Sequence, residues 1–141
     1  GVTIVTVNGP EGPVGMTVSS FLPITITTEL ILWSPAKHST RFPYFDVASH
    51  FAIHVLREDQ KDLALSFARN SDPFGRLDWH SNSHGVPIFD TCLARFDCVR
   101  HTAHDGGDHL IMVGRVEQAS RFDGGPLVFA TGDYGGFAKE T

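Results

Sequence analysis

Small hydroxyl side chains cluster at two places in the first third of the chain. Residues 15–21 read Gly-Met-Thr-Val-Ser-Ser-Phe, and residues 34–42 read Ser-Pro-Ala-Lys-His-Ser-Thr-Arg-Phe. Small side chains allow a flat ligand to approach the backbone, and hydroxyls donate hydrogen bonds without adding bulk. In the second segment, hydroxyls and loop amides could bind phosphate oxygens while Lys37 or Arg41 balances the charge. The simpler alternatives are a solvent-facing strand for the first segment and a solvated polar turn for the second.

Positive charge is scarce before this second segment. Lys37 is the first cationic side chain, and Arg41 is the only other one before Arg57. The whole chain has 11 Lys and Arg against 16 Asp and Glu, which gives a net charge of −5. An acidic chain without a basic stripe is a poor nucleic-acid binder, so no nucleic-acid partner is expected. The two early cations therefore point to a local anion site.

Eight histidines are a high count for 141 residues. His101, His104 and His109, with Asp105 and Asp108 between them, contain ligand types that could bind a metal. Two glycines interrupt this run, and the three histidines do not share one face of a regular element. We therefore expect no metal there, and interpret the segment as a hairpin turn that leads into a strand, with His109 at its start.

Other chemistries find little support in the residue pattern. No serine lies in a nucleophile elbow, and Cys92 and Cys98 show no local sign of activation. In a strand these two cysteines would be roughly 20 Å apart, too far for a disulfide, so buried free thiols are expected. The longest apolar runs are far too short to span a bilayer, and no signal peptide is apparent. We expect a cytoplasmic protein with a single core.

Alternating apolar and β-branched residues predict strands along most of the chain. The one convincing helix covers residues 59–69, with Asp59 as its N-cap and apolar residues at three-four spacing. A long polar loop is expected at residues 70–84. Asp-Gly-Gly turns at 105–107 and 123–125 separate the later strands. This arrangement is typical of an antiparallel sandwich or barrel. The predicted strands cover residues 2–7, 16–21, 24–33, 51–56, 91–100, 109–119 and 127–131.

Taken in order, several segments resemble the flavin reductase-like family, which has the FMN-binding split-barrel fold. No single segment is specific, but their order and spacing together are. The resemblance covers most of the chain and is carried by residues 1–6, 15–21, 30–35, 51–56, 60–68, 96–98, 107–109, 114–116 and 126–134.

This resemblance implies a mainly β, six-stranded antiparallel split barrel of Greek-key type with a few flanking helices. It implies one domain over residues 1–141, without the N-terminal helix that often precedes the first strand in the family. It also implies a homodimer that binds FMN or FAD near its interface and oxidises NADH or NADPH. Many members pass the reduced flavin to a separate monooxygenase.

The resemblance also implies roles for individual residues. Residues 17–20 would line the isoalloxazine ring, and residues 34–40 would hold the ribityl chain and phosphate. His109 is the expected catalytic residue, beside the nicotinamide during hydride transfer to flavin, or alternatively a histidine bonded only to its hairpin. The expected cofactor-binding residues are Thr17, Val18, Ser19, Ser20, Trp33, Ser34, Pro35, Lys37, Ser39, Thr40, Arg41, His54, Val55 and Tyr134.

The chain departs from the usual sequence of the family at two of these places. His54 stands where the family usually has Asn, and residues 22–29 lack its usual Ser-rich, Pro-Pro-containing stretch. Two alternatives to a reductase remain open at this point. One is a flavin-binding electron carrier without enzymatic turnover, and the other is a split barrel that uses its histidines for haem or metal.

Overall fold

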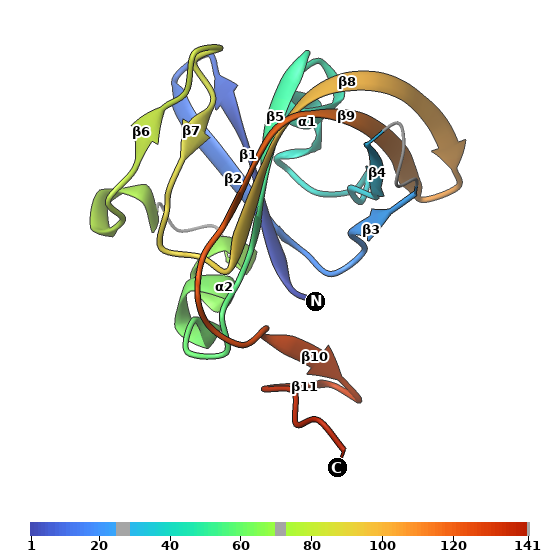
Figure 1. Ribbon diagram of the computed structural model, residues 1–141. Helices are drawn as coiled ribbons and strands as arrows, with labels where there is room; N and C mark the ends of the chain where they lie inside the picture. The colour runs from blue at the N-terminus through green and yellow to red at the C-terminus, as the bar shows by residue number, and fades with distance from the viewer. Residues whose placement is uncertain (25–28, 70–72, 141) are drawn as a thin grey trace.

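The computed structural model describes residues 1–24, 29–69 and 73–140. Its main feature is a curved, seven-stranded antiparallel sheet with strand order β2-β1-β5-β8-β9-β4-β3 (Figure 1). The strands of this sheet are β1 (Thr3–Gly9), β2 (Gly12–Val18), β3 (Leu22–Pro23), β4 (Leu30–Trp33), β5 (His50–Val55), β8 (Ala94–Gly106) and β9 (His109–Arg121).

Shorter elements flank the main sheet. One two-stranded sheet pairs β6 (His80–Ser81) with β7 (Pro87–Ile88), and another pairs β10 (Val128–Ala130) with β11 (Asp133–Gly135). The helices are α1 (Phe42–Asp46), α2 (Lys61–Ala68) and the short 3-10 helix η1 (Pro73–Arg76). In Figure 1, β10 and β11 lie near the C-terminus, away from the curled end of the β8–β9 hairpin.

Two large apolar clusters fill the molecule. The first lies within the curl of the sheet, where the ring of Trp33 contacts those of Phe45 and Phe51 at centroid distances of 5.5 and 5.7 Å. The second lies under α2, which buries Ala64 and Phe67 there. This is the helix face that the three-four spacing predicts.

The predicted N-cap of this helix is wrong. The helix begins at Lys61, and the preceding residue, Gln60, makes no side-chain cap. Instead, Gln60 Oε1 accepts a hydrogen bond from Arg57 N at 2.8 Å, and Gln60 Nε2 donates to Thr91 O. Gln60 is buried, so its amide serves the contact between α2 and the segment before β8 rather than the helix end.

Glycines and bulges allow the sheet to curl. A Cβ at Gly114 would lie 2.5 Å from Phe51 Cζ, so a larger residue there would displace a core ring. A Cβ at Gly15 would similarly lie 2.4 Å from Phe67 Cε1. Register shifts interrupt the β8–β9 pairing next to Asp97 and again next to Arg100. Bulges of this kind bend a strand and increase its local twist.

The mainly β, antiparallel architecture is confirmed, but the strand count and closure differ from the expectation. The main sheet has seven strands rather than six, and among the described residues its edge strands β2 and β3 are not hydrogen-bonded to each other. The continuous strand predicted over 24–33 is wrong. Within that span the described strand is β4, at residues 30–33, which pairs antiparallel with β3 so that Leu22 lies opposite Leu32. Residues 25–28 of that predicted strand lie outside the described residues.

The ends of several strands and loops also differ from the predicted ones. The second strand ends at Val18, whereas β8 and β9 are each 13 residues long and extend beyond the predicted spans. The expected polar loop at 70–84 contains η1 and β6, and its residues 70–72 lie outside the described residues. Pattern analysis did not predict α1 or β11.

Both cysteines are buried and free, as predicted. Burial raises the pKa of the Cys92 thiol to about 11 and raises that of the Cys98 thiol further. Neither thiol is therefore a reactive thiolate near neutral pH.

None of the helices described is long and apolar enough to cross a membrane.

Candidate functional site

The predicted phosphate loop lies against the start of β9. Ala36 and His109 form an antiparallel bridge, and Leu110 N donates to Pro35 O at 3.0 Å. Lys37 N donates to Asp108 O at 2.9 Å. These backbone contacts bring together two segments more than seventy residues apart, the hydroxyl-rich loop and the histidine that the sequence singled out.

The end of β2 joins the same region. Ser34 N donates to Ser20 Oγ at 2.9 Å, which ties the loop after β4 to the hydroxyl cluster after β2. Ser19 and Ser20 are both exposed at this position. The structure thus gathers Ser19, Ser20, the loop of residues 34–40 and His109 into one polar surface, which we call the loop site.

The loop itself offers unused hydrogen-bond donors. Ser39 N donates to Ala36 O at 3.2 Å and Ser39 Oγ accepts from Arg41 N at 3.2 Å, which closes a tight turn. Within the described part of the chain, the amides of His38 and Thr40 make no hydrogen bond, and both residues are exposed. Successive amides in such a turn form a concave anion-binding surface. The residues present therefore fit a phosphate group.

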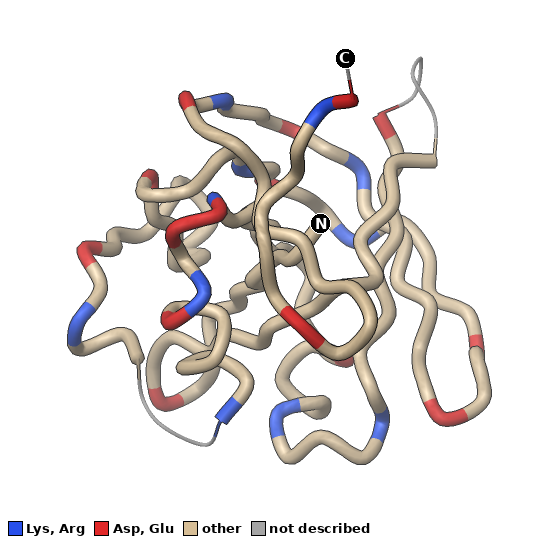
Figure 2. Tube along the Cα trace, turned by 90° about the horizontal axis from the view of Figure 1, so that it is seen from below, with Lys and Arg blue, Asp and Glu red and all other residues tan. Residues whose placement is uncertain are grey.

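Charges of both signs are spread along the chain (Figure 2), and acidic residues lie beside both Lys37 and His109. Lys37 Nζ pairs with the exposed carboxylate of Asp105, and His109 Nδ1 lies 2.8 Å from Asp108 Oδ1. The hydrogen bond from Lys37 lowers the pKa of Asp105, and that from His109 lowers the pKa of Asp108. Lys37 already has an acidic partner, so a phosphate would have to compete with Asp105 for it.

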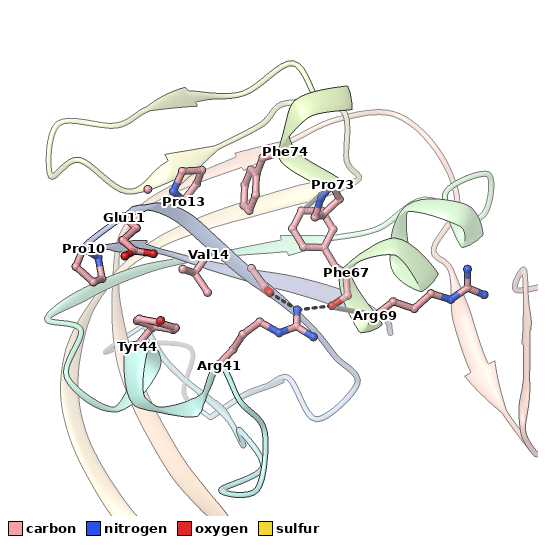
Figure 3. Close-up of a pocket in the computed structure, with 12 residues that line it drawn as sticks. Pro10, Glu11, Pro13, Val14, Arg41, Tyr44, Phe67, Arg69, Pro73 and Phe74 are labelled. Carbon is pink, nitrogen blue, oxygen red and sulfur yellow. Dashed lines mark hydrogen bonds between the residues drawn. The ribbon is translucent and has the colours of Figure 1, made fainter. Parts of the chain in front are cut away.

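Arg41, the other predicted cation, has a different role. Its Nη1 donates to the backbone oxygens of Gly15 and Phe67, each at 2.6 Å, and so joins β2 to the end of α2 (Figure 3). Burial lowers the pKa of this guanidinium. Arg41 also borders a cavity of about 510 Å³ between Tyr44, Phe67 and Phe74. These contacts direct the charged end of Arg41 away from the loop.

Other predicted cofactor-binding residues support the loop site from beneath. Trp33 is fully buried in the aromatic cluster, and Pro35 and Val18 are also buried. Thr17 Oγ1 donates to Ala64 O at 2.6 Å, so its hydroxyl binds α2. The side chains of these residues therefore serve the fold.

His54 is a core residue rather than a surface one. Its ring stacks on Phe89 at a centroid distance of 3.8 Å and an interplanar angle of 4°. Its Nδ1 lies 3.0 Å from Ile4 O, and its Nε2 accepts a hydrogen bond from Phe89 N at 3.2 Å. Burial lowers the pKa of His54 to about 3. Both nitrogens are satisfied within the protein, so we leave His54 out of the candidate site.

Two further predicted residues lie away from the loop site. Val55 is half-buried, and its carbonyl accepts a hydrogen bond from Leu93 N at 2.7 Å. Tyr134 lies on β11, where its ring faces Phe129 at 4.9 Å and packs against the cluster under α2. In Figure 1, β11 is well separated from the end of the β8–β9 hairpin, so Tyr134 does not join His109.

The three histidines of the hairpin each lie beside a different neighbour. His101 Nδ1 lies 3.2 Å from Arg115 Nη2, and His104 Nε2 lies 3.2 Å from Thr102 Oγ1. Together with the Asp108 contact of His109, these bonds give each histidine a separate neighbour. From the sequence, Asp105 and Asp108 were considered as turn residues or metal ligands, and their pairing with Lys37 and His109 was missed. The available signal was their position on either side of Gly106-Gly107, at a predicted hairpin tip next to His109.

Fold and site together describe a curled antiparallel β protein with a polar surface of loop amides, hydroxyls and His109. A model of the flavin reductase like domain matches residues 1–138. The chain belongs to the flavin reductase-like domain family, as the sequence resemblance indicated.

Individual relatives agree with this assignment. The chain is 52% identical over 140 residues to the FMN reductase (NADH) SmoA of Agrobacterium fabrum, covering 99% of this chain and 80% of that protein. It is 35% identical over 144 residues to HsaB of Mycobacterium tuberculosis, the reductase subunit of a flavin-dependent monooxygenase, covering 99% and 77%. Among solved structures, the NADH:FAD oxidoreductase SgcE6 of Streptomyces globisporus, in complex with NAD and FAD fragments, superimposes with a TM-score of 0.91 at 33% identity, covering 98% and 85%.

The burial of His54 predicts a specific pH dependence of stability. The pKa is about 3 in the folded protein and about 6.5 when unfolded, so the unfolded chain binds an extra proton between these values. The contribution of His54 is therefore fully present above about pH 6.5 and decreases as the pH falls toward 3, by up to about 1.4 kcal/mol per pH unit. Urea denaturation at several pH values measures this slope.

The variant His54→Asn should reduce that slope, because Asn does not titrate. His104→Asn, at an exposed position on β8, is the matched control and should keep the wild-type slope. Equal slopes in the wild type and His54→Asn would contradict the assignment of His54 as a neutral core residue.

Proposed function

We propose that this protein is an NADH-dependent flavin reductase that supplies reduced flavin to a partner monooxygenase. The observation that carries the proposal is the pairing of residues 35–37 with residues 108–110, which unites phosphate donors and His109 at one surface. Relatives named as an NADH-dependent FMN reductase and as the reductase subunit of a monooxygenase support both halves of it. They favour an enzyme over the alternatives of an electron carrier or a haem protein.

In this proposal the loop site binds the flavin. The free amides of His38 and Thr40, with the hydroxyls of Ser34 and Ser39, would hold the phosphate, and Lys37 would neutralise it. Ser19, Ser20 and the backbone of residues 17–18 would face the isoalloxazine ring. Arg41 and Trp33 would act indirectly, since their side chains fix the elements on either side of the loop.

His109 is the residue proposed to position the nicotinamide. Its side chain is 44% exposed, and its Nδ1 is held by the Asp108 carboxylate. Nε2 is therefore the ring nitrogen that remains for a ligand, and the hydrogen bond that Nδ1–H donates to Asp108 fixes the orientation of the ring. The reaction itself is hydride transfer from reduced nicotinamide to flavin, for which the protein supplies position and charge.

We also propose that the protein acts as a cytoplasmic homodimer. The free edge strand β3 carries the exposed side chain of Leu22, and the neighbouring Ile24 is exposed as well, at 55% and 45%. An exposed apolar edge of this kind is suited to association with a second copy.

Steady-state assays test the proposed activity directly. Purified protein with added FMN or FAD should oxidise NADH. The loss of NADH absorbance measures this reaction. His109→Gln should raise KM for NADH by about tenfold, because one charge-assisted or orienting contact to the nicotinamide is lost. The Kd for FMN should not change. His104→Gln should match the wild type. Tight flavin binding without any NADH turnover would support the carrier instead, and equal losses of NADH and FMN binding would give His109 a purely structural role.

A phosphate contact by Lys37 can be isolated by comparing two flavins. Riboflavin lacks the phosphate of FMN, so Lys37→Met should weaken FMN binding by about tenfold and leave riboflavin binding unchanged. Fluorescence titration measures both affinities. Lys61→Met, at an exposed lysine on α2, is the control. An equal loss of affinity for both flavins, or no loss for either, would remove Lys37 from the phosphate site.

A further inference from the structure

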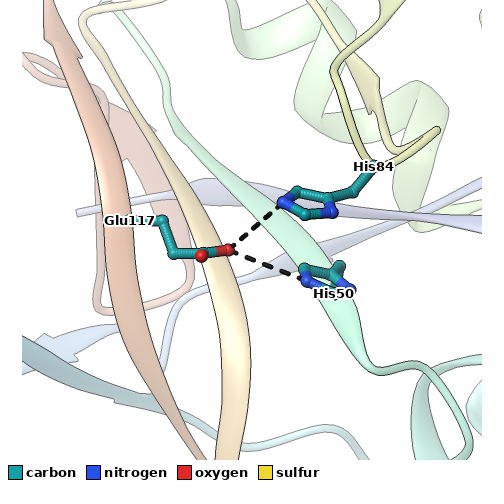
Figure 4. A group of neighbouring side chains, drawn as sticks. All are labelled: His50, His84 and Glu117. Atoms are coloured by element: carbon teal, nitrogen blue, oxygen red, sulfur yellow. Dashed lines mark ion pairs between the residues drawn. The ribbon is translucent and has the colours of Figure 1, made fainter.

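A second group of ligand-type side chains lies outside the loop site. His50, His84 and Glu117 come from β5, from the segment between β6 and β7, and from β9 (Figure 4). One ligand atom from each, a histidine nitrogen or a carboxylate oxygen, lies within 4.8 Å of the other two. Among the residues that the structure describes, this is the group of His, Cys, Asp and Glu side chains close enough to share a metal ion. We call it the His-His-Glu cluster.

A β-bulge directs Glu117 toward the two histidines. Asp97 pairs with Gln118, but the next residue, Cys98, pairs with Val116, so Glu117 is the extra residue of β9. An extra residue leaves the regular alternation of a strand, and bulges commonly re-aim a side chain in this way. The carboxylate consequently faces across β8 to β5, where His50 begins its strand.

Local hydrogen bonds hold both histidines in place. Asn82 Oδ1 accepts from His84 N at 2.9 Å and from Val86 N at 3.0 Å, which closes the loop that carries His84. His50 Nδ1 lies 3.0 Å from Ser49 Oγ. If Nδ1–H donates to that hydroxyl, the lone pair of Nε2 is free to bind a metal. Metal-bound histidines commonly have a supporting contact of this kind at the other ring nitrogen.

The spacing of the three side chains suits an ion better than direct hydrogen bonds. His50 Nε2 and His84 Nε2 lie 3.7 and 3.6 Å from the same oxygen of Glu117, beyond hydrogen-bond range. Ligand atoms around a tetrahedral zinc ion, each about 2.0 to 2.1 Å from the metal, are about 3.3 Å apart. The two rings stack at a centroid distance of 3.9 Å, so a tilt of the more exposed His84 ring would let both nitrogens face one ion.

We propose that the His-His-Glu cluster binds one Zn²⁺ ion through His50 Nε2, His84 Nε2 and Glu117 Oε1. Two neutral imidazoles and one carboxylate form the ligand set that zinc favours over Mg²⁺ or Ca²⁺, which prefer all-oxygen sites. An adjoining cavity of about 300 Å³, lined by both histidines, leaves room for water to complete the coordination. The ion would join the loop between β6 and β7 to the main sheet. This inference does not depend on the proposed reductase activity.

Zinc titration of the tag-free protein tests the site. Protein stripped with EDTA and dialysed should bind Zn²⁺ at one equivalent in isothermal titration calorimetry. Saturating Zn²⁺ should raise its Tm by roughly 5 °C, because an ion that binds only the folded state stabilises it. X-ray absorption at the zinc edge should show only nitrogen and oxygen ligands, at about 2.0 to 2.1 Å.

Matched variants separate the cluster from other surface histidines. His84→Gln and Glu117→Gln should each weaken Zn²⁺ binding by at least tenfold and abolish the rise in Tm. His80→Gln, an exposed histidine on β6 close to the same loop, should behave as the wild type. Because His84 lies on an exposed loop, we expect His84→Gln to fold. This variant therefore tests the site even if Glu117→Gln does not fold. The absence of one-equivalent binding, unchanged affinity in His84→Gln, or sulfur ligands would each overturn the proposal.

Discussion

The long antiparallel pairing of β8 with β9 is the constraint on which the rest of the structure depends. β8 pairs with β5 and β9 pairs with β4, so these two strands join the two halves of the main sheet. Bulges beside Asp97 and Arg100 curl the pair around the first apolar cluster. The same curl carries the hairpin tip to residues 35–37, and the first bulge turns Glu117 toward the histidines of the second proposed site.

The less exposed side chains near the loop site stabilise the fold, whereas the exposed groups are available to a ligand. The buried Trp33 and the half-buried Arg41 fix the elements from within, and the guanidinium of Arg41 donates to backbone oxygens instead of standing free at the surface. The exposed groups are amides, hydroxyls and the two pairs that Lys37 and His109 make with acidic residues. At the proposed site, a ligand phosphate would meet Lys37 already paired with Asp105. Its binding would be an exchange of partners rather than the filling of an empty charge site.

Much of the fold could be predicted from sequence because its signals are local. The β-branched run of β1 and the helix face of α2 follow from periodicity alone. The hydroxyl loop and His109 could be singled out by residue type, but their contact depends on strand pairing between distant segments. The break within residues 24–33 was missed because an apolar, alternating run favours a strand whether it stays straight or folds back. The burial of His54 and the inward turn of Arg41 depend on tertiary partners that neither residue's sequence neighbours reveal. The His-His-Glu cluster was missed for the same reason, since its members are more than thirty residues apart.

The loop site, rather than the cavity beside Arg41, is the proposed binding site of the flavin. Titration of isotope-labelled protein with FMN, followed by the backbone amide resonances, tests this proposal most directly. We expect the amide resonances of Ser20, His38, Thr40 and His109 to shift on FMN binding, with the largest changes at His38 and Thr40. Shifts confined to residues that line the cavity, such as Phe74, with the loop unaffected, would contradict it.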